Sequence, residues 1–283
     1  MTMNLLIGGN HFRLESDTQL RVEDQIKPFL CDASDEDAVR IRVVCGSGDI
    51  PAPTGPISGE DLLLEYYREK DAILCLSKGG VGGHLSTAVC KPDRKEVVCY
   101  IHSQRTSSLG SVGNVLRLIP IKMILQESGA IFLHGSQIAC QGKGILFTAP
   151  SGTGKTTQAK LWKAHRGAQI ICNDRVLIRA GQTYGYPVDG SEPVFSSASF
   201  PLGAVVLLEQ APENTIRRLR PREALIRLMP QMVYDHWSSD AVSAATQQLL
   251  ELIQRFPVYL LGCTPDEYAV TCLEQQLKKD GVL

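Results

Sequence analysis

The chain has 283 residues, a length typical of one large domain or of two domains of roughly 100–200 residues each. Hydrophobic residues make up 43% of the chain and charged residues 21%, which is ordinary for a globular protein and argues against disorder. The formal net charge of −1 does not point to a duplex-binding protein, so no nucleic-acid partner is expected.

The sequence contains no run of about 18 apolar residues, so neither a membrane-spanning helix nor a membrane partner is expected. The opening MTMNLLIGGNHF lacks the basic segment followed by an apolar segment that secretory signals share. The nine cysteines are scattered without a C-x-x-C pair, and several lie in apolar runs. They are typical of small buried side chains in a reducing compartment, so a cytoplasmic location is predicted.

The first 110 residues are predicted to form a β-rich domain. Runs of strand character occupy 4–9, 39–44, 71–77, 85–90 and 96–102. The run VRIRVV at 39–44 alternates apolar and polar residues, which is typical of a half-buried antiparallel strand. Stretches rich in Gly, Pro, Asp and Ser separate the runs. No Lys-Ser/Thr pair or helix follows the glycines of 79–83, so a hairpin loop is favoured there over a phosphate site.

From residue 111 the pattern changes to strands and helices in alternation. A helical segment, bent or started at Pro120 and ending near Gly129, is predicted over 111–130. The predicted strands are 130–136, 144–149, 168–174, 203–210 and 257–263. The predicted helices are 153–167, 221–231, 239–256 and 265–279. Buried strands that alternate with helices predict an α/β layer architecture, so the second domain is placed at 111–283.

The stretch GILFTAPSGTGKTTQAKLW carries the main functional prediction. It fits the phosphate-loop pattern G-x-x-x-x-G-K-[ST], with Ala149 in place of the first glycine. Glycines let backbone N–H groups curl around an anion, and the helix N-terminus adds unpaired donors. Lys155 would then bridge the β- and γ-phosphates, and the Thr156 hydroxyl would ligate Mg²⁺. The predicted nucleotide-binding residues are Ser151, Gly152, Thr153, Gly154, Lys155, Thr156 and Thr157.

Candidate catalytic residues lie at the ends of neighbouring strands. Asp174 ends the strand after the phosphate loop, where open α/β sheets build their sites. It is the first candidate for ligating Mg²⁺ or for accepting a hydroxyl proton, with a turn cap as the alternative. His134 ends the strand before the loop, and by itself is typical of a structural histidine. Glu209 ends another apolar strand and is either a ligand of Mg²⁺ through water or a surface residue.

Two further features stay open. Asp189 and Glu192 lie in a segment that could cover the site, although their spacing assigns them no role. A cluster of arginines is typical of a solvated face, or alternatively of a clamp for a substrate carboxylate or phosphate. Its members are Arg217, Arg218, Arg220, Arg222 and Arg227.

The stretch LHGSQIACQGKGILFTAPSGTGKTTQAKLWKAHRGAQIICNDRVLI resembles the catalytic core of HPr kinase/phosphorylase. Within that family it is most similar to the HPr-kinase-like proteins of ribosomal peptide pathways, those of lasso peptides among them. The resemblance rests on a His-Gly strand end, a short hairpin, the phosphate loop and an acid soon after it. Phosphoenolpyruvate carboxykinase shares this compact layout. The resemblance covers residues 130–215 and continues more weakly towards the C-terminus.

This resemblance implies a phosphate-loop kinase core that uses ATP and Mg²⁺ to phosphorylate a serine hydroxyl of a peptide or small protein. By position, Lys155 and Thr156 would hold phosphates and metal, and His134 would assist near the γ-phosphate. Asp174 completes the expected catalytic set of His134, Lys155 and Asp174, and joins Thr156 as a metal ligand. No match to the family's phosphorolytic signature is found, so we expect a kinase and not a phosphorylase. HPr kinases are hexamers, so a homo-oligomer is also expected.

The chain departs from the family at Asn173, where HPr kinases have the first of two successive aspartates. Either Asp174 acts as the one acid, or Glu209, Asp189 or Glu192 supplies the missing role. A small-molecule kinase, for instance on free serine, and a nucleotide-binding regulator without turnover remain as alternatives, and Asn173 favours the regulator. No N-K-x-D motif is present, so the choice between ATP and GTP is open. The β-rich domain is expected to present the peptide to the kinase core.

Overall fold

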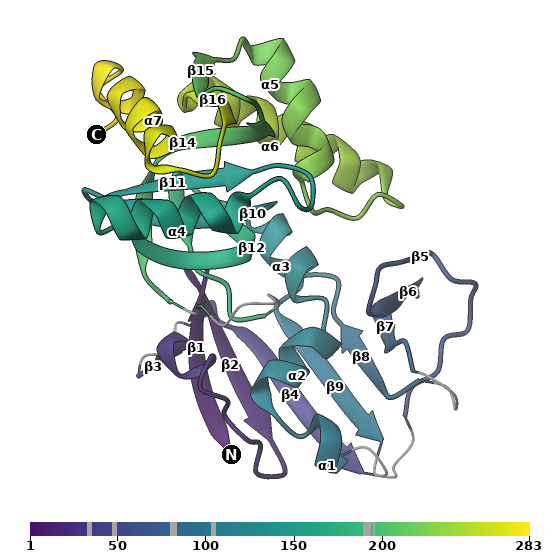
Figure 1. Ribbon diagram of the computed structural model, residues 1–283. Coiled ribbons are helices and arrows are strands. Elements are labelled where there is room, and N and C mark those ends of the chain that lie inside the picture. The colour runs from purple at the N-terminus through teal and green to yellow at the C-terminus, as the bar shows by residue number, and fades with distance from the viewer. Residues whose placement is uncertain (33–35, 47–49, 80–83, 103–105, 189–193, 195) are drawn as a thin grey trace. The chain divides into compact units, whose positions relative to one another are not determined.

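The computed structural model divides the chain into two compact units (Figure 1). The first unit comprises Met1–Ser128 and Asp235–Ala241, and the second comprises Gly129–Tyr234 and Val242–Leu283. The structure describes residues 1–32, 36–46, 50–79, 84–102, 106–188, 194 and 196–283. Most of the predicted hairpin loop at 79–83, together with Asp189 and Glu192, lies outside the described residues.

The first unit is built on a nine-stranded sheet with the order β3-β1-β2-β4-β9-β8-β7-β6-β5. The strands are β1 (Thr2–Ile7), β2 (Asn10–Ser16), β3 (Leu30–Cys31), β4 (Val39–Gly46), β5 (Gly59–Glu60), β6 (Leu64–Arg68), β7 (Ile73–Ser77), β8 (Ser86–Cys90) and β9 (Glu96–His102). Its helical segments are η1 (Lys27–Phe29), α1 (Thr106–Leu109), α2 (Val112–Leu118) and α3 (Ile121–Glu127). The described part of this unit is therefore mostly β, as the composition of its sequence suggests.

Strand β4 corrects one prediction. Buried Ile41 and Val43 alternate with exposed Arg40 and Arg42, as expected of a half-buried strand. However, β4 runs parallel to both of its neighbours, β2 and β9. The prediction of an antiparallel strand was wrong because side chains alternate with a period of two in both kinds of ladder. Alternation reports which face is buried, and it does not report the direction of the neighbouring strands.

The helical segment predicted over 111–130 consists of two short helices, and the predicted break at Pro120 and end near Gly129 are confirmed. Ile119 and Pro120 leave the helical conformation between α2 and α3, because proline disfavours a helical conformation in the residue before it. Helix α2 contacts β7 and β8 of the first sheet. The contacts therefore divide the chain after Ser128, which is later than the expected domain boundary at residue 110.

The segment Asp235–Ala241 belongs to the first unit although it comes from the second half of the sequence. The ring of Trp237 packs against Tyr66, with 5.2 Å between the ring centroids. The guanidinium of Arg68 lies 5.8 Å from the centroid of the same indole ring. A Cβ atom at Gly59 would collide with this ring, so the glycine is required for the close approach. Aromatic packing thus anchors this segment to the strands of the first unit.

A buried charge network anchors the same segment. Asp235 is 4% exposed, and its Oδ1 lies 2.7 Å from the Nζ of Lys122, which in turn lies 3.4 Å from Asp61 Oδ2. Burial alone would raise the pKa of Asp61, but the charge of Lys122 and hydrogen bonds from Leu64 and Tyr66, among others, hold it below its ordinary value. Lys122 therefore neutralises two carboxylates inside the first unit.

Replacing Lys122 with methionine is expected to lower the free energy of unfolding by about 3–5 kcal/mol, because it leaves buried Asp235 and partly buried Asp61 without their shared counter-charge. Urea unfolding measures the effect. The control is Lys95→Met, which breaks the 2.7 Å ion pair between Lys95 and Asp37. The side chains of these two residues are 60% and 81% exposed. That change is expected to cost less than about 1 kcal/mol. Equal losses in the two variants would contradict the assigned role of Lys122.

The second unit contains a seven-stranded sheet with the order β11-β10-β12-β13-β14-β16-β15 and a further pairing of β11 with β14. Its strands are β10 (Ile131–Cys140), β11 (Lys143–Thr148), β12 (Gln169–Arg179), β13 (Gln182–Tyr184), β14 (Ser199–Gln210), β15 (Thr215–Arg218) and β16 (Val258–Cys263). Its helices are α4 (Lys155–Arg166), α5 (Pro221–Leu228), η3 (Met229–Gln231), α6 (Ser239–Arg255) and α7 (Glu267–Lys279). The pairs β11–β14 and β14–β16 are parallel, and the other pairs are antiparallel.

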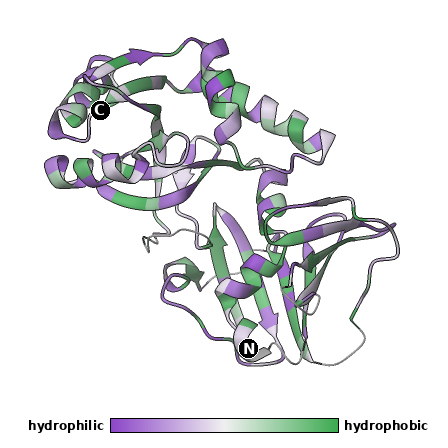
Figure 2. Cartoon of the chain, turned by 45° about the vertical axis from the view of Figure 1, so that its right-hand side comes forward, coloured by the Kyte–Doolittle hydropathy of each residue, from purple (hydrophilic) through white to green (hydrophobic). Residues whose placement is uncertain are grey.

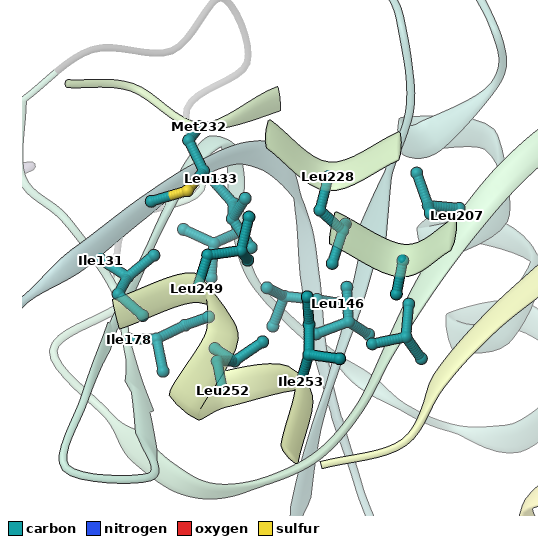
Figure 3. Close-up of a cluster of buried hydrophobic side chains, with 14 of the residues drawn as sticks. Ile131, Leu133, Leu146, Ile178, Leu207, Leu228, Met232, Leu249, Leu252 and Ile253 are labelled. Atoms are coloured by element: carbon teal, nitrogen blue, oxygen red, sulfur yellow. The ribbon is translucent and has the colours of Figure 1, made fainter. Parts of the chain in front are cut away.

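Both faces of this sheet are buried. On β11, Leu146 belongs to the cluster that contains Leu249 and Leu252 of α6 (Figure 3). The next residue, Phe147, belongs to a second cluster, with Trp162 of α4 and Leu273 of α7. Hydrophobic segments, green in Figure 2, accordingly run along the strands of this sheet. Helices on both faces of a mixed sheet confirm the predicted α/β class.

Two further observations bear on the sequence predictions. All nine cysteines are free thiols, and the buried ones are Cys75, Cys90, Cys99, Cys140, Cys172 and Cys263. None of the helices in the described part of the chain is long and apolar enough to cross a membrane.

Candidate functional site

The loop between β11 and α4 contains the predicted nucleotide-binding residues. Strand β11 ends at Thr148 and α4 begins at Lys155, so a strand, a loop and a helix follow one another as predicted. Gly152 and Gly154 have φ values of +78° and +112°, which side chains disfavour, and open space lies where their Cβ atoms would be. The first backbone N–H groups of α4 have no partner within the helix. Loop and helix together offer free donors and the positive end of a helix dipole.

The side chain of Lys155 turns back onto this loop. Its Nζ donates to the carbonyl oxygens of Ala149 at 2.9 Å and Pro150 at 3.1 Å. Burial lowers the pKa of Lys155, and the negative charge of Asp174 opposes this shift. The residue is 9% exposed, so a positive charge is held at the base of the loop, within electrostatic reach of Asp174.

The other predicted loop residues differ in exposure. Ser151 and Thr157 are exposed, and Thr156 is half-buried in the first turn of α4. The hydroxyl of Thr153 donates to the carbonyl oxygen of Pro150 at 2.9 Å, which closes the turn of the loop. Ser151 thus lies on the exposed side of the loop, and Thr156 and Thr157 lie in the first turn of α4.

Strands β10 and β12 bring His134 beside Asp174. In their antiparallel register His134 lies opposite Arg175, and Gly135 lies opposite Asp174. His134 Nε2 and Asp174 Oδ1 are 3.1 Å apart, and both side chains are more than one-third exposed. The hydrogen bond from His134 lowers the pKa of Asp174, and the charges of Arg175 and Lys155 act in the same direction against the effect of burial. Asp174 is therefore an ionised carboxylate at neutral pH.

Beside this pair, Gly135 allows β10 and β11 to approach each other closely. A Cβ atom at Gly135 would lie 2.6 Å from the carbonyl oxygen of Phe147 on β11. The hydroxyl of Thr148, at the end of β11, donates to the carbonyl oxygen of His134 at 2.7 Å. These contacts place His134 next to the residue from which the loop departs.

Replacing His134 with alanine is expected to raise the pKa of Asp174 towards its ordinary value, because the largest cause of the depression is removed. A carboxyl group whose pKa is lower in the folded than in the unfolded chain stabilises the fold at pH values above its unfolded pKa. This stabilisation is lost as the pH falls through the pKa of the folded state. The variant should therefore lose less stability on acidification than the wild type. NMR titration of the carboxyl carbon measures the pKa.

The matched control for this prediction is His165→Ala, which removes the 3.5 Å contact of His165, near the end of α4, with Glu267 of α7. That change should leave the pKa of Asp174 where it is in the wild type. A pKa that does not move in His134→Ala would show that the pair does not form in solution.

Glu209 and Arg227 lie near the same end of β14. Gln210 Nε2 donates to the carbonyl oxygen of Gly152 at 3.5 Å, which brings the end of β14 to the loop. Glu209 Oε2 lies 3.7 Å from Arg227 Nη1, and Arg227 also pairs with Glu223 at 3.2 Å. Two hydrogen bonds from Arg217 hold the pKa of Glu223 at about 2. Arg217 and Arg227 are thus paired with acids, which favours a solvated surface over a clamp for these two residues.

The residues of this edge suit Mg²⁺ held jointly with phosphate. The described residues include no group of three or more His, Cys, Asp or Glu side chains that could hold a metal ion by themselves. Mg²⁺ is commonly held by one or two protein ligands together with substrate phosphates and water. The hydroxyl of Thr156 and the ionised carboxylate of Asp174 fit that pattern, and the space beside Gly152 and Gly154 is open.

Sequence reasoning missed two features of this edge. Asp174 has a φ of +106°, although it lies inside a strand. Nothing in the local sequence signals this, because it depends on the pairing of β12 with β10. The contact of Gln210 with the loop was also missed, although its position at the end of a strand next to Glu209 could have suggested it.

Fold and site thus define a mixed α/β protein with a glycine-containing loop, a buried lysine and a histidine–carboxylate pair at one edge of its second sheet. The chain belongs to the family described as SynChlorMet cassette protein ScmC, whose family model matches residues 97–275. The matched region contains the loop, His134 and Asp174.

Comparison with other proteins adds little to this assignment. Among solved structures, the Hpr(Ser) kinase/phosphatase from Coxiella burnetii matches 53% of this chain and 93% of its own at 14% sequence identity. Its TM-score of 0.25 is too low to establish a shared fold. No curated protein matches the chain.

Proposed function

We propose that this protein is a Mg²⁺- and ATP-dependent kinase that transfers the γ-phosphoryl group to a serine hydroxyl of a peptide or small protein. The observation that carries the proposal is the meeting, at one sheet edge, of a loop with a buried lysine and an ionised carboxylate held by a histidine. Transfer of a phosphoryl group depends mainly on positioning and on neutralising charge, and these groups supply both.

Each residue then has a distinct task. Lys155 and the N–H groups at the start of α4 bind phosphate oxygens and oppose their negative charge. Thr156 and Asp174 would hold Mg²⁺, which neutralises phosphate charge when it is bound. Asp174 alternatively accepts the proton of the serine hydroxyl, for which its ionised form is required. His134 orients the Asp174 carboxylate through the 3.1 Å contact.

The acceptor is proposed from the family description and from the first unit. The family is described as a cassette protein, so we look for the serine-bearing peptide among the products of the same cassette, in peptide natural-product biosynthesis. The first unit would present that peptide to the second, and a homo-oligomer would be the working form.

Transfer from γ-labelled ATP into serine-bearing peptides, free serine and small proteins tests the proposal, with GTP as a second donor. Label in a peptide supports it. Label only in free serine would favour the small-molecule kinase. Nucleotide binding without transfer to any acceptor would favour the regulator, which the single acid at Asn173-Asp174 already suggests.

The role of the first unit requires a test on the full chain. Deleting residues 1–110 would uncover Trp237 and remove Asp61 from the network of Lys122 and Asp235. Loss of activity after that deletion would therefore report misfolding as well as lost peptide binding. A peptide that carries a photoreactive group and is cross-linked to the intact protein avoids this ambiguity. Cross-links confined to the second unit would contradict the presenting role.

A further inference from the structure

The side-chain amide of Asn173 is buried without hydrogen bonds. The residue is 8% exposed, and neither Oδ1 nor Nδ2 has a partner among the described residues. The other buried side-chain atoms in this condition occur singly, one to a residue: Asn4 Oδ1, Ser86 Oγ, Gln158 Oε1, Trp162 Nε1, Trp237 Nε1 and Asp235 Oδ1, the last of these ion-paired with Lys122. Because buried polar groups without partners destabilise a folded protein, two such atoms on one residue call for an explanation.

The residue that follows Asn173 is strained. Asp174 has a φ of +106°, in a region that side chains rarely adopt. The other described non-glycine residues with positive φ are Arg94, Gln141 and Ala180, at φ values of 58°, 48° and 50°, and each lies in a turn between two strands. Asp174 is the exception because it lies within β12. Strain of this kind persists where the surrounding structure and a function require it.

The unpaired amide lies on the side of the sheet that α4 covers. Asn173 is paired with Ser136 of β10, which is paired with Phe147 of β11. Residues paired across strands share a face of the sheet, and Phe147 packs with Trp162 of α4. Helix α4 contacts β10, β11 and β12. The Asn173 amide is therefore on the face from which the loop and the first turn of α4 rise.

We infer that Asn173 is a positioning residue whose amide gains hydrogen-bond partners when a phosphate-bearing ligand occupies the loop. The inference rests on the proposed function for the nature of that ligand. The unpaired amide and the strained φ of Asp174 destabilise the free protein. When the ligand binds, β12 and the start of α4 adjust around it, and the new hydrogen bonds of the amide offset this destabilisation. Asn173 would thus act on the site through the position of Asp174.

The test uses Asn173→Leu, which keeps the size of the side chain and removes both polar atoms. The free variant should unfold at a higher temperature than the wild type, because it no longer buries an unpaired amide. Its Kd for AMP-PNP with Mg²⁺, measured by calorimetry, should be at least tenfold higher than that of the wild type. Asn173 would then be a residue that lowers stability and raises ligand affinity.

A matched control is Gln137→Met, which removes a buried amide whose nitrogen and oxygen both have partners. Gln137 is paired with Cys172 of β12, and its Nε2 donates to Thr183 Oγ1 at 2.6 Å. This variant should unfold at a lower temperature than the wild type and keep the wild-type Kd. Both variants lose a buried amide. A higher Tm for Asn173→Leu together with a lower Tm for Gln137→Met would show that the Asn173 amide is unpaired in the free protein and that the Gln137 amide is paired.

The outcomes distinguish this inference from the proposed function. An Asn173→Leu variant that binds AMP-PNP as tightly as the wild type would overturn the inference alone. A wild-type protein that does not bind AMP-PNP with Mg²⁺ would overturn both. If Asn173→Leu does not fold, NMR of the wild-type Asn173 side-chain amide decides the question. Its proton signals should shift and exchange more slowly with water on addition of AMP-PNP, and unchanged signals would overturn the inference.

Discussion

Replacing Lys155 with alanine is expected to lower the rate of phosphoryl transfer at saturating ATP by at least about 10²–10³-fold. The ammonium group is held at the base of the loop by the carbonyl oxygens of Ala149 and Pro150, and Lys155 is a buried residue. A charge in such a site opposes the charge of the moving phosphoryl group far more strongly than it would in water. Single-turnover transfer from labelled ATP measures the effect.

The control for this change is Lys163→Ala, on the same helix but exposed to solvent. That variant should transfer phosphate at the wild-type rate. The free energy of unfolding should fall in Lys155→Ala, because Ala149 is buried and its carbonyl oxygen loses this donor, whereas water can replace the donor at exposed Pro150. The transfer rate is therefore compared under conditions in which the variant is fully folded. A rate within tenfold of the wild type in Lys155→Ala would contradict the proposed role of the loop.

Replacing Asp174 with asparagine is expected to lower the transfer rate by about 10²–10⁴-fold. The change preserves the shape of the side chain and removes its charge. Asparagine is among the residues that best tolerate positive φ, so the backbone of β12 at φ +106° should be retained. The matched control is Glu213→Gln, which changes an exposed acid in the turn between β14 and β15. This variant should bind ATP and transfer phosphate as the wild type does.

The dependence of the Asp174→Asn variant on Mg²⁺ separates the two roles proposed for the carboxylate. If Asp174 is a metal ligand, high Mg²⁺ should restore part of the rate, because the amide oxygen still binds the metal weakly. If Asp174 accepts the hydroxyl proton, added Mg²⁺ should restore nothing. A variant with the wild-type rate at all Mg²⁺ concentrations would show that another group performs both tasks.

Elements with a strong local pattern were predicted well, and elements that depend on neighbours were not. The strand at β11, the loop and α4 follow from contiguous residues, because apolar runs, glycines and helix formers act over a few positions. The strands β2, β3, β5, β6, β13 and β15 were not predicted. Two of these, β13 and β15, have only 3 and 4 residues and are strands because longer strands lie beside them.

The same distinction applies to the site. Its residue types and their order along the chain were read from the sequence. The sequence placed Lys155 after the glycines of the loop, and it placed His134 and Asp174 on the strands that precede and follow β11 in the chain. The 3.1 Å contact between His134 and Asp174 arises from the register of β10 with β12. The sequence carries no signal for that register, because both faces of β10 are buried and its apolar residues do not distinguish one register from the next.

By itself, then, the sequence determined the α/β class, the loop with its lysine and the residues available for chemistry, because these depend on short stretches of chain. Tertiary structure alone decided the parallel pairing of β4, the return of Asp235–Ala241 to the first unit and the unpaired amide of Asn173. Each of these depends on residues far apart in the sequence, whose contacts form only when the whole sheet is assembled.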